Sequence, residues 1–129
     1  MVIKYPQATL DAMATALAAT LTHLTVGTGD DAIQLSTTDL ETAVQIGSSD
    51  RNKAIDSNSV TDNSFQVTAT LQATEPNSQP VNLRELGFQS GLNTSNDLRL
   101  ALILPSSQTK DNASRWTIRA SGSVEEQTE

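Results

Sequence analysis

VNLRELGFQSGLNTSNDLRLALILPSSQTKDNASRWTIRA, residues 81–120, contains three short apolar runs separated by polar connections rich in Asn, Ser, Gly and Asp. The middle run, DLRLALILP, places leucines on one face of a strand and Ala101 and Ile103 on the other. A strand with two apolar faces is typical of a buried position, so we expect it in the middle of the fold or against a neighbouring chain. It ends at Leu104-Pro105, and GLNTSND before it is expected to be a hairpin connection.

The first of these runs, VNLRELGF, breaks strict alternation between Leu83 and Leu86, where Arg84 and Glu85 intervene. A slip of this kind predicts a β-bulge or an edge kink. The two charged side chains are expected either to pair within the fold or to pair across a subunit boundary, and we favour the internal role. A bridge between arginine and a carboxylate fixes geometry more than it adds stability.

Outside that stretch, the clearest strand pattern is SFQVTATLQA at 64–73, where every second residue is apolar. LTHLTVGTG at 21–29 predicts another strand with one buried face. TLDAMATALAAT at 9–20 predicts a short helix that Thr9 caps and whose first turn holds Asp11. The helix face expected to pack on the sheet comprises Leu10, Met13, Ala14, Leu17 and Leu21.

The segment from 30 to 64 is polar and sparsely apolar, and we expect it to protrude and contact a partner. The whole pattern predicts one domain over 1–124 that is mainly β, an antiparallel β-sandwich or open barrel with one short N-terminal α-helix. The last residues, EEQTE at 125–129, are expected to form an acidic flexible tail.

Composition narrows the classes of function. The net charge is −7 and the basic residues are scattered, so the chain lacks the basic stripe with which proteins bind nucleic acid. No cysteine is present, which excludes a disulfide framework and a thiolate nucleophile. The longest apolar segment is too short and too polar to insert into a membrane, and it follows a single Lys4 rather than the basic start of a signal peptide. We therefore expect synthesis in the cytoplasm of a host cell.

Residues that could carry catalysis are few. His23 is the only histidine and has no partner at the spacing of a metal site or a general base, and no GxSxG motif is present. GTGDDA at 27–32 lacks both the ligand pattern of a calcium loop and the motif of a phosphate loop, so a solvated turn is the better interpretation. We predict that the chain is not an enzyme and that it has no cofactor and no metal.

Several of these motifs, read in order, resemble those of phage tail-fibre and tail-collar attachment proteins. The alanine-rich helix is followed by LTHLTVGTG, which is similar to an ITHIAVGTG-like strand of that family, and LRELGF at 83–88 is similar to an IREVGLF-like signature. LETAV at 40–44 loosely matches an LxNEVxR-like segment, with Arg51 displaced. Pro105, Lys110 and WTIRASG match a turn of the P-x-x-x-K-T type and a final amphipathic strand.

This resemblance implies a structural subunit of a phage tail or of a phage-like contractile or injection apparatus. Because the chain ends at Glu129 without a shaft, it implies a baseplate or tail-fibre adaptor located in the virion tail. The partners would be other tail, baseplate or fibre subunits, and a homo-oligomer such as a trimer or a hexameric ring is expected. The interface residues implied are Arg84, Glu85, Lys110 and Arg51.

The sequence also fits two other functions. The first is a head-decoration or neck protein of a virion. The second is a small carbohydrate-binding β-sandwich, although only four aromatic residues are available to stack on a sugar ring.

Overall fold

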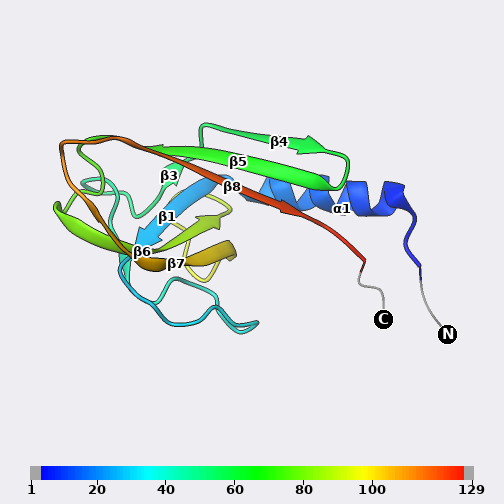
Figure 1. Cartoon of the computed structure of the whole chain (residues 1–129), viewed down its shortest axis with the longest axis horizontal. Helices are drawn as coiled ribbons and strands as arrows, with labels where there is room; N and C mark the ends of the chain where they lie inside the picture. Colours follow the sequence, from blue (N-terminus) through cyan, green and yellow to red (C-terminus); the bar gives the residue numbers. More distant parts are fainter. Residues whose placement is uncertain (1–3, 127–129) are drawn as a thin grey trace.

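A computed structural model of the chain describes residues 4–126. These residues form one helix, α1 (Gln7–Thr20), and eight strands in two antiparallel sheets, which confirms the predicted mainly β class (Figure 1). The strands are β1 (His23–Gly27), β2 (Ala43–Val44), β3 (Lys53–Ala54), β4 (Ser57–Thr61), β5 (Ser64–Leu71), β6 (Val81–Gln89), β7 (Leu98–Lys110) and β8 (Trp116–Ser123).

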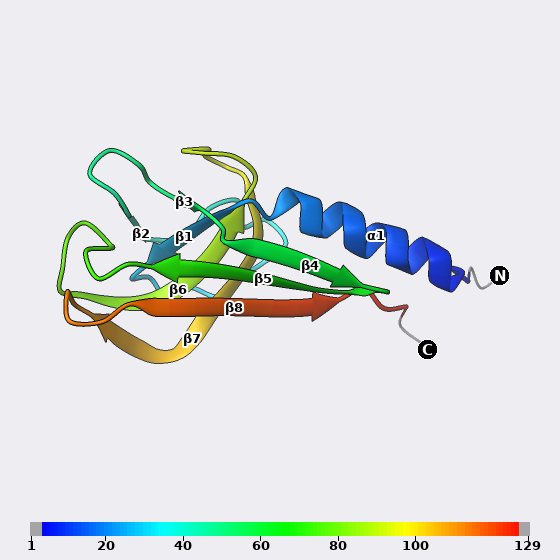
Figure 2. The same ribbon diagram turned by 90° about the horizontal axis from the view of Figure 1, so that it is seen from above.

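The two sheets face each other as layers. The large sheet has the order β2-β1-β6-β7, with β3 also paired to β1, and the small sheet has the order β4-β5-β8. Seen from above, the small sheet runs along the length of the molecule while β6 and β7 cross beneath it at an angle (Figure 2). Helix α1 runs beside β4, away from the large sheet (Figure 2), and contacts β4 and β5. The arrangement agrees with the predicted sandwich or open barrel.

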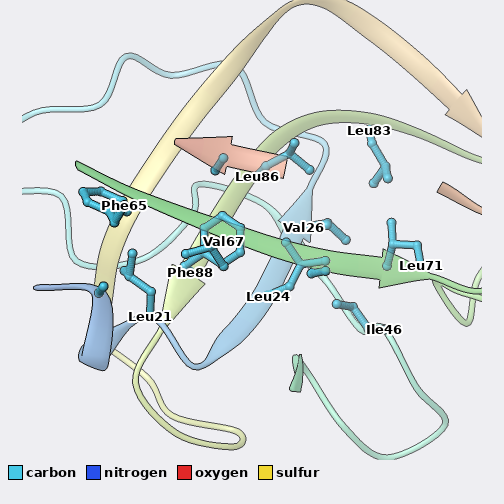
Figure 3. Close-up of a cluster of buried hydrophobic side chains, with 13 residues drawn as sticks. Leu21, Leu24, Val26, Ile46, Phe65, Val67, Leu71, Leu83, Leu86 and Phe88 are labelled. Atoms are coloured by element: carbon cyan, nitrogen blue, oxygen red, sulfur yellow. The ribbon is translucent and has the colours of Figure 1, made fainter. Parts of the chain in front are cut away.

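The core fills the space between the sheets (Figure 3). In β5 the alternation predicted for 64–73 is confirmed, because every second side chain from Phe65 to Leu71 is buried. The large sheet supplies the facing layer from β1 and β6. Burying each large apolar side chain contributes roughly 1.5–3 kcal/mol. The facing residues are Leu24, Val26, Leu83, Leu86 and Phe88.

Helix α1 begins earlier than predicted. Pro6 occupies the N-cap position and its carbonyl accepts the Thr9 N–H at 2.9 Å, so the capping role expected of Thr9 is wrong. Asp11 consequently lies beyond the first turn, where it accepts a hydrogen bond from the Gln7 amide at 2.7 Å.

The packed face of α1 also differs from the prediction in part. Ala14 and Ala18, one turn apart, are the buried residues of the helix, while Met13 remains 48% exposed. Alanine has no side chain beyond Cβ, so the helix lies close against β4 and β5, and Met13 falls on a different side of the helix cylinder. The Asn58 amide on β4 then bonds the Ala18 carbonyl at 3.0 Å and fastens the end of the helix.

Strand β1 is buried on both faces rather than on one. Thr25, expected on a solvent-directed face, is only 4% exposed. A covering segment, residues 28–42, is bonded to the outer face of the large sheet through Glu85 and to β7 through the Leu98 N–H. The expected excursion over 30–64 is therefore partly packed: it also contains β2, β3 and β4, and Leu40 and Ile46 are buried.

The β-bulge predicted near Arg84 is confirmed, but its extra residues belong to β7. Leu83 pairs with Gln108 and Glu85 with Ile103, so Arg84 alone faces the four residues 104–107. Pro105 lies among those four and has no N–H to offer a ladder. The Arg84 Nε donates instead to the Leu104 carbonyl at 2.7 Å and bridges the gap.

Two predictions for the leucine-rich run are wrong. Strand β7 does not end at Leu104-Pro105 with a turn to Lys110, because it resumes its pairing with β6 and continues to Lys110. It also does not lie in the middle of the fold, because it pairs with β6 alone and forms an edge of the large sheet. No residue from 98 to 104 is fully buried, and Leu102 is 40% exposed. The other expectation, that a neighbouring chain covers this strand, stays a prediction.

No helix of the described residues is long and apolar enough to cross a membrane. Of the tail predicted at 125–129, residues 127–129 lie outside the described part of the chain.

Candidate interaction surfaces

Glu85 anchors the covering segment from inside the fold. Its side chain is 1% exposed, and its two carboxylate oxygens accept the backbone N–H groups of Glu41 at 3.1 Å and Thr42 at 2.8 Å. A buried carboxylate needs such donors, because it has lost its hydration. Gly27 makes room for it: a Cβ there would overlap the Glu85 Oε1 and lie 2.5 Å from the Thr42 carbonyl oxygen.

Lys110 is a second internal anchor. Its side chain is completely buried, and its ammonium group donates to the carbonyls of Gln72 at 3.1 Å, Ala73 at 3.4 Å and Asp111 at 2.8 Å. The three donors of an ammonium group thus all have acceptors. Lys110 joins the end of β5 to the end of β7, which belong to different sheets.

The four residues implied as interface residues therefore differ in burial: two are buried, one is half-buried and one is exposed. Glu85 and Lys110 are buried against their own chain, so the expectation that they lie on a surface open to a partner is wrong. Arg84 is half-buried and holds the bulge from within the fold, as favoured, but it does so through a backbone carbonyl: within residues 4–126 neither Arg84 nor Glu85 forms the expected ion pair. Arg51 is exposed, its backbone N–H bonded to the Asn93 side chain at 2.7 Å, and its role in an interface stays a prediction.

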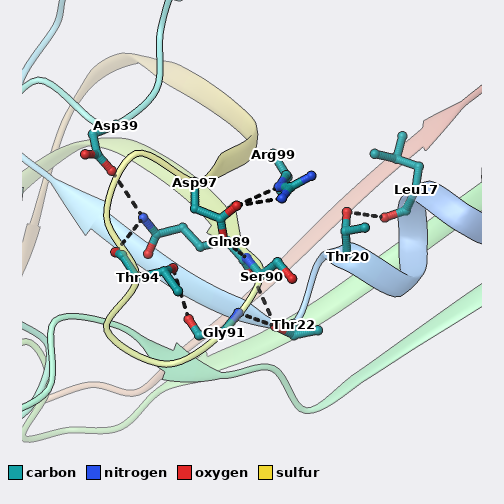
Figure 4. Close-up of polar contacts among 10 residues, drawn as sticks. All are labelled: Leu17, Thr20, Thr22, Asp39, Gln89, Ser90, Gly91, Thr94, Asp97 and Arg99. Atoms are coloured by element: carbon teal, nitrogen blue, oxygen red, sulfur yellow. Dashed lines mark hydrogen bonds and ion pairs between the residues drawn. The ribbon is translucent and has the colours of Figure 1, made fainter.

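A polar network holds the connection between β6 and β7 (Figure 4). Gln89 is buried, its amide oxygen accepting from Asn52 at 2.7 Å and its amide nitrogen lying 3.4 Å from the Asp39 carboxylate. Asp39 in turn accepts the Asn96 N–H at 2.9 Å. Sequence reasoning missed this network, because Asn, Gln and Asp in loops look like solvated residues until a second loop is placed beside them.

Asp97 closes the same connection. Its carboxylate accepts the Ser90 N–H at 3.0 Å and pairs with Arg99 at 2.7 Å. The hydrogen bond from Arg99 lowers the pKa of Asp97 below its ordinary value of 3.8, and the Ser90 bond acts in the same direction. Partial burial opposes this shift without cancelling it.

The other polar groups singled out in the sequence form no catalytic arrangement in the described residues. His23 is half-buried, with its Nδ1 2.8 Å from the Thr22 hydroxyl. Asp30, Asp31 and Glu41 are exposed, and Glu41 accepts the backbone N–H groups of both aspartates at 2.9 Å. Two of these carboxylates, Asp31 and Glu41, line a hollow of about 550 Å³ that is bordered mainly by the covering segment. A loop closed by its own acidic side chain accounts for this cluster.

The sheet edges offer contrasting surfaces. β2 and β3 have two residues each, and β4, SNSVT, is polar. On β8 the exposed positions are threonine, arginine and serine. β7 differs from the other described edges in one respect: a large apolar side chain, Leu102, is exposed on it, between half-buried leucine, alanine and isoleucine. Within residues 4–126, no backbone hydrogen bond joins residues 99–104 to any segment other than β6. We call residues 99–104 the β7 edge.

No family model, curated protein or solved structure matches the chain. The resemblance to phage tail attachment proteins therefore rests on the motifs quoted above.

Proposed function

We propose that this chain is a non-enzymatic structural subunit of a phage tail or phage-like injection apparatus, an adaptor that holds baseplate, tail or fibre subunits together. The observation that carries the proposal is the β7 edge, where unpaired backbone groups and half-exposed leucines occur together. Such an edge is a template for pairing with another polypeptide, and soluble proteins commonly protect it with charges or keep it short. Residues 100–104 of this strand carry no charge and no proline, because Arg99 and Pro105 lie at the two ends of the run.

The hydrogen bonds that certain polar side chains form within the chain support the same function. Glu85 and Lys110 bond backbone groups of distant segments, and Gln89 and Asp97 fix the connection that leads into β7. These groups give the strand a rigid support. A rigid edge binds with less loss of conformational entropy than a mobile one, so the arrangement suits a scaffold.

The alternative of a carbohydrate-binding sandwich is less favoured. Phe65 and Phe88 are buried in the core and Trp116 is half-buried, so three of the four aromatic side chains are occupied by packing. A sugar ring is usually stacked on an exposed aromatic side chain. The role of a head-decoration or neck protein would use the same kind of protein surface, and the location of the chain in a particle separates it from the tail role.

The proposal is tested by deleting the gene in the phage or injection system that encodes the chain and imaging the particles by electron microscopy. We expect particles with missing fibres or an incomplete tail tip. Particles with complete tails and full infectivity would overturn the proposal.

Complementation of the deletion sharpens this test. Leu102→Lys, which places a charge on the β7 edge, should fail to restore complete tails. Ser59→Lys is the matched control, because it places the same charge on an exposed position of β4, the polar edge of the small sheet. If both variants restored complete tails equally well, the β7 edge would not be needed for tail assembly.

A further inference from the structure

The β7 edge is bounded at both ends by features that interrupt regular pairing. At one end, Phe88 of β6 pairs with Leu100 but the next residue, Gln89, pairs with Leu98, so Arg99 is an extra residue. The Leu98 N–H donates to the Thr38 carbonyl at 3.0 Å. At the other end Pro105 enters the wide bulge. The regular part between Arg99 and Pro105 therefore has Leu102 at its centre.

The side chains of this part divide between two faces. Leu100 and Leu102 pair with the core residues Phe88 and Leu86, so they belong to the face that looks toward the small sheet, and Leu104 packs against the core as well. Ala101 and Ile103 therefore point to the other face. In a lone chain the inward leucines stay partly exposed, because no further strand lies beyond β7.

This short segment is complementary to itself. If a second copy approaches antiparallel about a twofold axis at Leu102, the two Leu102 side chains meet on the axis and Leu100 faces Leu104 of the partner. On the opposite face the small Ala101 meets the larger Ile103. Every pair joins residues of the same face. The large sheet of one copy therefore continues into the large sheet of the other, with the inner face of one next to the inner face of the other.

Charge also favours a second copy here. The chain has a net charge of −7, so two copies repel each other over most of their surface. Strand β7 is free of carboxylates along all 13 of its residues. Its Arg99 is paired with Asp97 of its own chain and its Lys110 is buried, so the segment that would cross the axis is close to neutral.

We propose that the β7 edge binds the β7 edge of a second copy of this chain, forming a twofold dimer with one continuous sheet through both molecules. The inference rests on the proposed function, because it names the partner of the surface by which the chain would assemble. It differs from the trimer or hexameric ring implied by the family resemblance, since pairing of identical edges closes after two copies.

The test uses cysteine cross-linking of the full-length chain, which has no cysteine of its own. In Leu102→Cys the two new thiols lie opposite each other on the proposed axis, at a strand separation that permits a disulfide. We expect diamide to convert most of this variant to a covalent dimer on a non-reducing gel. Ser59→Cys, on the exposed β4 edge, is the control and should stay mainly monomeric. Equal cross-linking of the two variants would overturn the inference.

Sedimentation measures the unmodified chain and separates this inference from the proposed function. We expect wild type to approach twice the 13.7 kDa mass of one chain as concentration rises, and Leu102→Lys to stay at 13.7 kDa. A wild type that is monomeric, trimeric or hexameric throughout, with no Leu102→Cys cross-link, overturns the second copy as partner. If complementation still required Leu102 in that case, the edge would bind a different tail protein and the proposed function would stand.

Discussion

At the scale of single residues, two buried charged side chains determine how segments far apart in sequence meet. Glu85 holds the covering segment and Lys110 joins the ends of two sheets, each through backbone groups rather than through an opposite charge. An unmade hydrogen bond to a buried charge costs more than an ordinary contact contributes. Both residues are therefore sensitive positions. The internal role was favoured for Glu85, whereas Lys110 was expected in a turn and at an interface.

Gly27→Ala should destabilise the fold by about 1–3 kcal/mol, because the added methyl group overlaps the Glu85 carboxylate and the Thr42 carbonyl. Gly47→Ala is the control, since a Cβ there meets its nearest neighbour at 3.7 Å. Urea unfolding of both variants measures the difference. Equal midpoints would show that a methyl group fits at Gly27, so that Glu85 and the Thr42 carbonyl do not lie as close to it as described.

Lys110→Met should cost about 1–3 kcal/mol, because three carbonyls lose their donor while the stem of the side chain is kept. Lys4→Met, at an exposed position, should leave stability nearly unchanged. Thermal melts compare the two. A Lys110→Met variant as stable as Lys4→Met would contradict the burial of this ammonium group.

At the scale of elements, sequence patterns identified strands well but not their places in the sheets. The period of β5 and the bulge at Arg84 followed directly from alternation, since side-chain direction is a local property. The position of β7 at an edge was missed, because a run apolar on both faces reads the same whether its own chain or a second chain covers it. The network around Gln89 was missed for a related reason: its partners come from three separate loops.

Leu102→Ala should cost well under the ~2–5 kcal/mol expected for Leu24→Ala, because Leu102 is 40% exposed whereas Leu24 is fully buried. Urea unfolding at low protein concentration, where copies do not associate, makes the comparison. If the two substitutions cost the same, β7 would lie inside the fold as the sequence alone suggested.

The connection between β6 and β7 should respond to acid through Asp97. The folded state lowers the pKa of this carboxyl below 3.8, so its contribution to stability is complete above that pH and is lost as the pH falls through the folded value. The stability difference between wild type and Asp97→Asn should therefore shrink as the pH is lowered from 7 to about 3. A difference that stays constant over this range would contradict the pairing with Arg99.

At the scale of the whole molecule, two layers and a helix present four sheet edges of unequal character (Figures 1 and 2). Among the described edges, β7 alone exposes a large apolar side chain, that of Leu102, whereas the exposed positions of β4 and β8 are polar or charged and β2 and β3 have two residues each. The sequence predicted the class of fold because the spacing of apolar residues and the position of turn residues can be recognised within a few consecutive residues. It did not predict the surface, because the edges are defined only once the two sheets have been assembled.

Amide hydrogen exchange across residues 99–104 is the sharpest test of whether another polypeptide pairs with the β7 edge. It should be measured by mass spectrometry on the dilute free chain and on intact particles, with peptides from β4 as the internal reference. We predict that the N–H groups of this edge that face away from β6 exchange fast in the free chain and are strongly protected in particles, while β4 changes little. Equal exchange of the β7 edge in both states would show that no other polypeptide pairs with it.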